Sequence, residues 1–172
     1  MGFRINELTE DAYSVALENI ESELEARFYE NDVAEFVKSV RVFCDKFDLR
    51  LIDVEIQIFS RSYVNIGLGG SWEDDESALE HIRTINETKL EESHGKCSLT
   101  GVYTDPMLFD YFVKRGDLVL ADNVEDEIST AINKGLDSFV TDLENTLSSN
   151  KNLIEFAEDN EFRFDEDGEL VG

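Results

Sequence analysis

Few residues of this chain have the type and spacing that enzymatic or metal chemistry needs. The 172 residues include two histidines, His81 and His94, and two cysteines, Cys44 and Cys97. His94 and Cys97 would supply two of the four ligands of a structural zinc site, with no second Cys or His pair nearby. Nucleophilic catalysis needs a histidine near a serine or cysteine, and both histidines fall in a polar stretch, residues 73–95. We therefore interpret them as surface residues and predict no metal site and no cofactor.

Carboxylates give no better indication of catalysis. Asp and Glu together number 40, so pairs of acids occur by chance at every spacing. Glycoside or phosphoryl chemistry cannot be argued from such pairs. We expect a protein that is not an enzyme.

The closing sequence EFRFDEDGELVG contains a stretch that looks like part of a calcium loop. If Gly168 were the glycine at position 6 of an EF-hand, Arg163 would occupy position 1, where a carboxylate is required, and position 12 would fall after residue 172. Spacing therefore excludes an EF-hand. Asp167-Gly168 instead suits a turn with positive φ, between residues 162–164 and Leu170-Val171. We expect a terminal hairpin docked on the sheet, with solvated acids.

The spacing of apolar residues predicts several amphipathic helices. Thr9 is expected to cap the first, and Asn31 or Asp32 to restart the pattern as a second. Cys44 lies on the apolar side of the second helix and is expected in the core. Apolar residues recur at three- and four-residue steps in residues 10–28, 32–47, 106–116, 124–147 and 150–159.

Elsewhere the pattern alternates, as it does in strands. Residues 51–58 and 63–68 predict an antiparallel hairpin with one face packed on helices. Residues 3–6 and 96–103 predict further strands. The expected fold is one α+β domain over residues 1–172: a small antiparallel sheet, made of the central hairpin plus terminal strands, packed against about five amphipathic helices.

The charge of the chain is its most unusual property. Forty acidic and 15 basic residues give a net charge of −25, beyond what solubility requires. Residues 121–172 alone carry 15 acids and three bases. Phosphates would be repelled, so direct binding of nucleic acid is not expected. Such a surface suits a basic partner, although a generic acidic surface is the alternative interpretation.

The composition also bears on location. No apolar run reaches the length of a membrane span, and the first residues lack the pattern of a secretory signal. The two cysteines belong to no framework of paired spacings. We predict a cytoplasmic protein that does not bind membranes.

Both ends of the chain resemble a family of small acidic proteins encoded by bacteriophages and prophages. The opening FRINELTEDAYSVALENI is similar to the family's aromatic–x–Glu-Leu–x₃–Ala–x₃–Ala start, with Glu7 two places displaced, and the end is similar to its Asn–x–aromatic–x–Phe–x₂–Asp-Gly–x–Leu closure. The resemblance implies a phage or mobile-element origin, where small acidic proteins commonly disarm bacterial defence nucleases. Its motifs carry no catalytic residue. The matching positions are Phe3, Glu7-Leu8, Ala12, Ala16, Asn160, Phe162, Phe164, Asp167-Gly168 and Leu170.

Charge and resemblance together predict an inhibitor of the anti-CRISPR type, acting in the cytoplasm of the host cell. Its acids would imitate the phosphates of a nucleic acid and occupy the basic groove of a host nucleic-acid-binding protein, with an RNA-guided CRISPR effector as the first candidate. Acids on a helix recur about every 5.4 Å, comparable with phosphate spacing. The predicted partner-binding residues are Glu73, Asp74, Asp75, Glu76, Glu125, Asp126, Asp142, Glu144, Glu155, Glu158 and Asp159.

A second class of function stays open at this point. The protein could instead be an antitoxin or regulatory module that neutralises a basic partner through a hydrophobic surface. Growth rescue without any defence system would distinguish this class from the first.

Overall fold

The computed structural model describes residues 2–69, 108 and 124–171. The chain forms two compact units: unit 1 consists of Met1–Asn31 and Asp142–Gly172, and unit 2 of Asp32–Thr141. Unit 1 thus combines the two ends of the chain. The single domain predicted for residues 1–172 stays a prediction.

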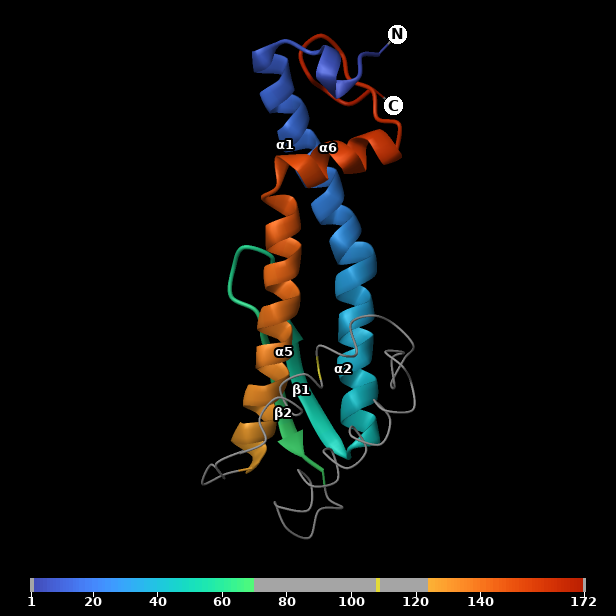
Figure 1. The fold of residues 1–172 in the computed structure, drawn as a ribbon. Helices are drawn as coiled ribbons and strands as arrows, with labels where there is room; N and C mark the ends of the chain where they lie inside the picture. The colour runs from blue at the N-terminus through green and yellow to red at the C-terminus, as the bar shows by residue number, and fades with distance from the viewer. Residues whose placement is uncertain (1, 70–107, 109–123, 172) are drawn as a thin grey trace, which may run out of the picture. The chain divides into compact units, whose positions relative to one another are not determined.

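Unit 1 is built around two capped helices. Helix α1 (Glu10–Arg27) begins after Thr9, whose Oγ1 accepts a hydrogen bond from the Ala12 N–H at 3.4 Å, which confirms the predicted cap. Helix α6 (Asn150–Asp159) begins after Ser149, which caps it in the same way. The two helices cross and pack together (Figure 1). Their buried residues are Ala12, Ala16, Ile20, Leu24, Leu153 and Ala157.

The terminal segments of unit 1 are not strands of a sheet, so that prediction is wrong. Phe3 and Phe164 exchange two backbone hydrogen bonds of 2.8 and 3.0 Å, but this pair is an isolated bridge, and Phe164 forms a second one with Leu170. A 3-10 turn, Ile5–Glu7, follows immediately. The C-terminal loop docks on α1 and not on the central sheet, because the Asn19 side chain donates a hydrogen bond to the Gly168 carbonyl at 3.1 Å.

A π-helical segment joins α1 to α2 in the chain. The segment spans Phe28–Val33, and α2 (Ala34–Lys46) follows directly. The predicted restart at Asn31 or Asp32 is therefore wrong. Residues 10–46 contain no Gly or Pro to end a helix, and the Asn31 side chain donates back to the Arg27 carbonyl at 3.0 Å. The apolar spacing widens to five residues between Phe28 and Val33, which is the spacing of a π turn.

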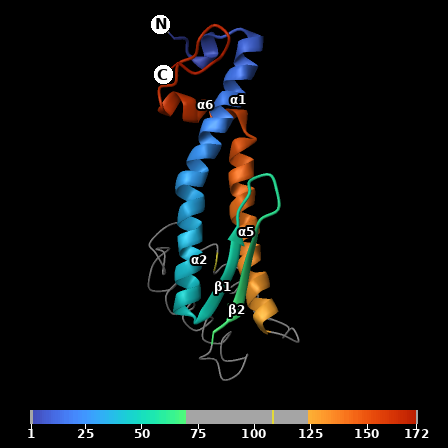
Figure 2. The same ribbon diagram turned by 180° about the vertical axis from the view of Figure 1, so that it is seen from behind.

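Unit 2 contains the predicted hairpin, which the structure confirms. Strands β1 (Leu49–Glu55) and β2 (Tyr63–Leu68) pair antiparallel. A bulge between Leu51 and Asp53 leaves Ile52 without a partner in the ladder. The strands lie side by side from either direction of view (Figures 1 and 2).

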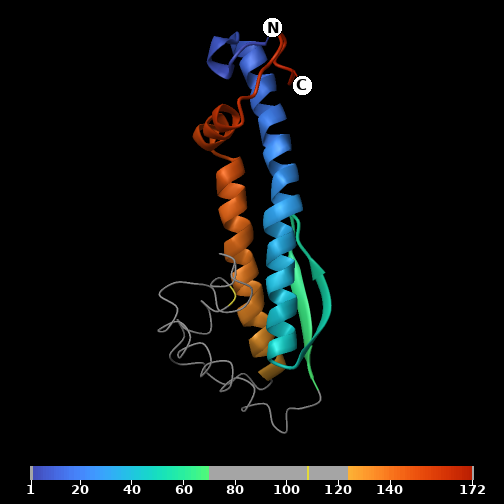
Figure 3. The ribbon, with the colours of Figure 1, turned by 90° about the vertical axis from the view of Figure 1, so that its right-hand side faces the viewer.

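The core of unit 2 lies between the hairpin and two helices. Helix α5 spans Val124–Leu147, as predicted, and its residues up to Thr141 belong to this unit. Phe36 of α2 stacks on Phe139 of α5, with ring centroids 4.5 Å apart. The hairpin covers one side of this helix pair (Figure 3). Cys44 is buried in α2, as predicted.

The overall fold class must be corrected. The structure is α+β, but its described part has three uninterrupted helices, residues 10–46, 124–147 and 150–159, and one two-stranded sheet. The prediction of about five helices with terminal strands was wrong, because the first two predicted helices are continuous and the terminal segments form only single bridges. The predicted strand at residues 96–103 and all but Leu108 of the predicted helix at residues 106–116 lie outside the described residues. None of the described helices is long and apolar enough to cross a bilayer.

Candidate functional site

Helix α1 carries a face made of acidic residues, which we call the α1 acidic face. With about 100° per residue around the axis, its five members fall within a sector of about 100° and extend about 22 Å along the helix. The buried residues of α1 lie in another sector; on this face Glu10, Asp11 and Glu18 are exposed, and Glu21 and Glu25 are half-buried. Its members are Glu10, Asp11, Glu18, Glu21 and Glu25.

No member of the α1 acidic face forms an ion pair with a described lysine or arginine. Glu10 and Asp11 lie in the first turn, where the helix dipole stabilises negative charge. Glu18, Glu21 and Glu25 have no such compensation and follow one another at steps of three and four residues. Like charges at this spacing cost about 0.2–0.5 kcal/mol per pair. Repulsion among these three carboxylates therefore weakens the helix.

The sequence by itself indicates this face, although its acids are not among the predicted partner-binding residues. The acids of residues 10–25 have the same helical period as the apolar residues beside them. The predicted partner-binding residues lie instead at positions 73–76 and in the C-terminal third, which carries 15 acids and three bases.

On α5, the predicted residues have mixed surroundings. Asp126 is exposed, whereas Glu125 is half-buried and its Oε2 lies 3.4 Å from the Leu68 N–H, so it caps a strand residue. The exposed positions that follow include Lys134, whose Nζ lies 3.6 Å from the carboxylate of Asp137. This part of α5 is therefore not a continuous acidic row.

In unit 1, the predicted residues are exposed or half-buried at separate positions. Asp142 is exposed and Glu144 half-buried near the end of α5. On α6, Glu155 lies 3.6 Å from Lys151, which reduces its charge locally, while Glu158 and Asp159 are exposed. The role of these residues in binding a partner stays a prediction. Glu73, Asp74, Asp75 and Glu76 lie outside the described residues.

The acidic loop near the C-terminus is a turn held by its own side chain. Asp165 Oδ1 accepts hydrogen bonds from the N–H groups of Asp167 and Glu169, both at 3.0 Å. Gly168 has a φ of +89°, so the predicted glycine turn is confirmed. The Asp165 carboxylate thus has a structural role.

Reactive groups are not gathered in the described part of the chain. Burial, followed by the nearby charge of Asp45, raises the pKa of the Cys44 thiol to about 12, so it is not a thiolate at neutral pH. Among described residues no three His, Cys, Asp or Glu side chains are grouped as metal ligands. His81, His94 and Cys97 lie outside that part.

No family model, curated protein or solved structure matches this chain. The resemblance of its ends to phage proteins therefore stays a prediction. The structure does bring the residues of the two end motifs together in unit 1: Ala12 and Ala16, which are 3% and 0% exposed, face Gly168, and Phe3 pairs with Phe164. These residues pack one end of the chain on the other.

Proposed function

We propose that this protein is a phage or mobile-element inhibitor of a bacterial defence nuclease, acting as an acidic mimic of nucleic acid. The observation that carries the proposal is the α1 acidic face, on one helix in a chain of net charge −25. Five carboxylates over about 22 Å compare with about six phosphates along the same length of one DNA strand, at 3.4 Å each. The partner would be a basic groove, with an RNA-guided CRISPR effector as the first candidate.

The α1 acidic face costs stability when the protein is alone. Repulsion among Glu18, Glu21 and Glu25 would be relieved by lysines and arginines of a partner, because each pair then gains charge-assisted hydrogen bonds. The partner in turn would lose its counterions, as it does on binding DNA. Binding should therefore weaken steeply as salt increases.

A matched pair of triple variants tests the proposal. E18K/E21K/E25K reverses three residues of the α1 acidic face, and E30K/D45K/E166K makes the same change in net charge at exposed positions outside that face and outside the predicted partner-binding residues. We expect the first variant to lose inhibition of DNA cleavage by a purified RNA-guided nuclease, and the second to retain most of it. Circular dichroism would verify that both remain folded.

Two results would contradict this function. Equal loss in both variants would mean that only total charge matters and that no defined face is used. Inhibition that is independent of salt and of both charge reversals would exclude nucleic-acid mimicry.

One observation favours the alternative of an antitoxin or regulatory module. Ile52 and Phe59, on the central hairpin, are 52% and 53% exposed and offer apolar contacts to a partner. An antitoxin would restore growth to cells expressing its toxin when no defence system is present. I52S/F59S would abolish that rescue, whereas E18K/E21K/E25K would preserve it.

A further inference from the structure

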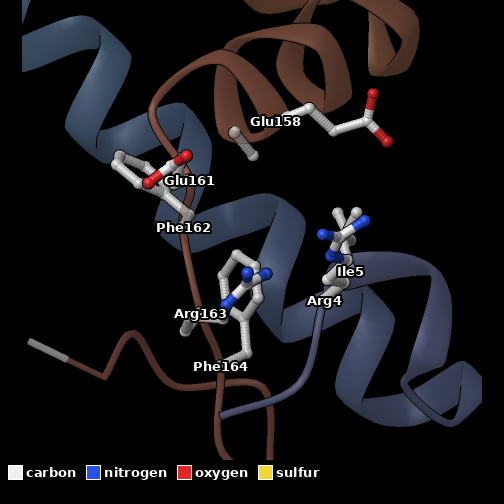
Figure 4. Close-up of a pocket in the computed structure, with 8 residues that line it drawn as sticks. Arg4, Ile5, Glu158, Glu161, Phe162, Arg163 and Phe164 are labelled. Carbon is white, nitrogen blue, oxygen red and sulfur yellow. The ribbon is translucent and has the colours of Figure 1, made fainter.

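A pocket of about 280 Å³ lies in unit 1, between the two ends of the chain. Its lining comes from the first residues, the end of α6 and the segment after it (Figure 4). The apolar part of the wall is well buried: Ile5 is 4% exposed, Ala157 3% and Phe164 0%. Phe162, half-buried, adds an aromatic ring.

Two arginines, Arg4 and Arg163, line this pocket. The isolated antiparallel bridge between Phe3 and Phe164 brings the segments that carry them together. Figure 4 shows both side chains beside the pocket.

Neither arginine is neutralised within the described part of the chain. No ion pair joins the guanidinium of Arg4 or Arg163 to a described carboxylate, although the Arg4 backbone N–H donates to Glu7 Oε2 at 2.7 Å. Glu158 and Glu161 line the same pocket, and Figure 4 shows the carboxylate of Glu161 beside Phe162 and that of Glu158 on the same side of the pocket as Arg4. By contrast, Arg27 of the same unit donates to Asn160 Oδ1 at 2.8 Å and lies over the Phe156 ring. Two arginines in one pocket without an ion pair to a described residue are unexpected in a chain with 40 acids.

We propose that this pocket binds a small organic monocarboxylate with an apolar body. A guanidinium group presents paired N–H donors that match a carboxylate, and two of them would share one anion and relieve their own repulsion. The buried apolar wall favours an organic anion over an inorganic one. Glu158 and Glu161 at the rim would repel a ligand with several negative charges, such as a nucleotide or a nucleic acid.

The experiment uses the full chain and three probes followed by two-dimensional NMR. N-acetyl-phenylalanine carries one carboxylate and an apolar ring, its amide lacks the charge, and inorganic phosphate lacks the apolar body. We expect the acid to shift the Nε–H signals of Arg4 and Arg163 with saturation at millimolar concentration, and the amide and phosphate to bind at least about tenfold more weakly.

Variants connect the binding to the two arginines. R4Q and R163Q are each expected to weaken the acid about tenfold, and R163K to weaken it less, because lysine keeps the charge without the paired donors. R41Q, at an exposed position of α2, is the matched control and should leave the affinity unchanged. If circular dichroism shows that R163Q does not fold, R4Q and R163K still test the proposal.

Several outcomes would overturn the proposal. Binding of the amide as tight as that of the acid would remove the role of the carboxylate, and tighter binding of phosphate would remove the role of the apolar wall. Affinity unchanged in R4Q and R163K, or the absence of a saturable shift in the unmodified chain, would show that the arginines do not form a site.

Discussion

Gly168 shows how one residue determines the packing of unit 1. Its φ is +89°, and a Cβ added there would lie 2.1 Å from the Ala12 carbonyl oxygen of α1. The loop therefore approaches the helix backbone more closely than any side chain permits. Ala12 and Ala16 supply the other half of this contact, because larger side chains would hold the loop away.

We predict that G168A destabilises the protein by about 2–4 kcal/mol, from the strained φ together with the clash. Urea unfolding followed by circular dichroism would measure the change. G67A is the matched control, since a Cβ there meets the end of the flexible Arg50 side chain at 3.3 Å and Ile52 Cδ1 at an ordinary contact distance of 3.6 Å, and it should cost less than about 1 kcal/mol. Equal effects would mean that the loop does not dock on α1.

Tyr63 gives a prediction that depends on pH. Its hydroxyl donates to Asp53 at 2.8 Å, and this bond, with that to Glu55 and the nearby negative charge, raises the pKa of Tyr63 from 10.0 to about 12. The raised pKa means that the folded state favours the neutral phenol. The resulting stabilisation is complete below pH 10 and is lost as the pH rises toward 12.

Phenolate absorbance, titrated against pH, would test this expectation. We expect Y63F to remove one late-titrating group and D53N to move that group to lower pH. D45N, at an exposed acid of α2, should leave the curve unchanged. A curve in which D53N has no effect would contradict the assigned hydrogen bond.

At the scale of elements, side chains of α5 close the outer edge of the hairpin. The Val64 N–H donates to Asn133 Oδ1 at 2.8 Å, and Asn133 Nδ2 donates to the Val64 carbonyl at 2.7 Å. One amide side chain thus replaces the pairing that a third strand would provide. Glu125 accepts from Leu68 further along the same strand. A strand edge closed in this way does not recruit another chain.

We predict that N133A destabilises the protein by about 2–3 kcal/mol, because it leaves two partly buried backbone groups of Val64 unpaired. Chemical denaturation would measure the loss, and increased light scattering would report an opened strand edge. N145A, at an exposed position of the same helix, should change stability by less than about 0.5 kcal/mol. A small effect of N133A would mean that water replaces the amide without cost.

Elements with a strong period were predictable from the sequence, and their ends were less so. The apolar stripe of α5 and the alternation of the hairpin place their buried side chains unambiguously, and both predictions are confirmed. The π segment at Phe28–Val33 was missed because Asn31 and Asp32 favour helix starts locally, whereas the structure uses them inside a helix without a breaker. The terminal strands were predicted from alternation that spans only a few residues, too few to separate a strand from a single bridge.

At the scale of the whole molecule, negative charge opposes folding. A net charge of −25 on 172 residues produces self-repulsion that salt screens. Among the described residues, the ion pairs Glu35–Lys38, Lys134–Asp137 and Lys151–Glu155 each join exposed side chains three or four residues apart on one helix, so screening by salt removes little stabilisation from them. Salt should therefore have a net stabilising effect.

We predict that the melting temperature rises by roughly 5 °C between about 10 mM and 300 mM NaCl. Scanning calorimetry would measure it, and KCl at equal ionic strength should give the same rise, since screening does not depend on the cation. A melting temperature that is constant or falls with salt would show that the acids are already neutralised within the fold.

The sequence by itself determined the helical and strand periods, the helix cap at Thr9 and the glycine turn at Gly168, because these features depend on neighbours within a few residues. It also determined the excess of acids. Only the tertiary structure decided that the two ends of the chain pack together, that Arg4 and Arg163 line one pocket, and that Gly168 lies against Ala12 of α1. Those facts depend on contacts between residues more than a hundred positions apart, and local patterns contain no information about which distant residues will meet.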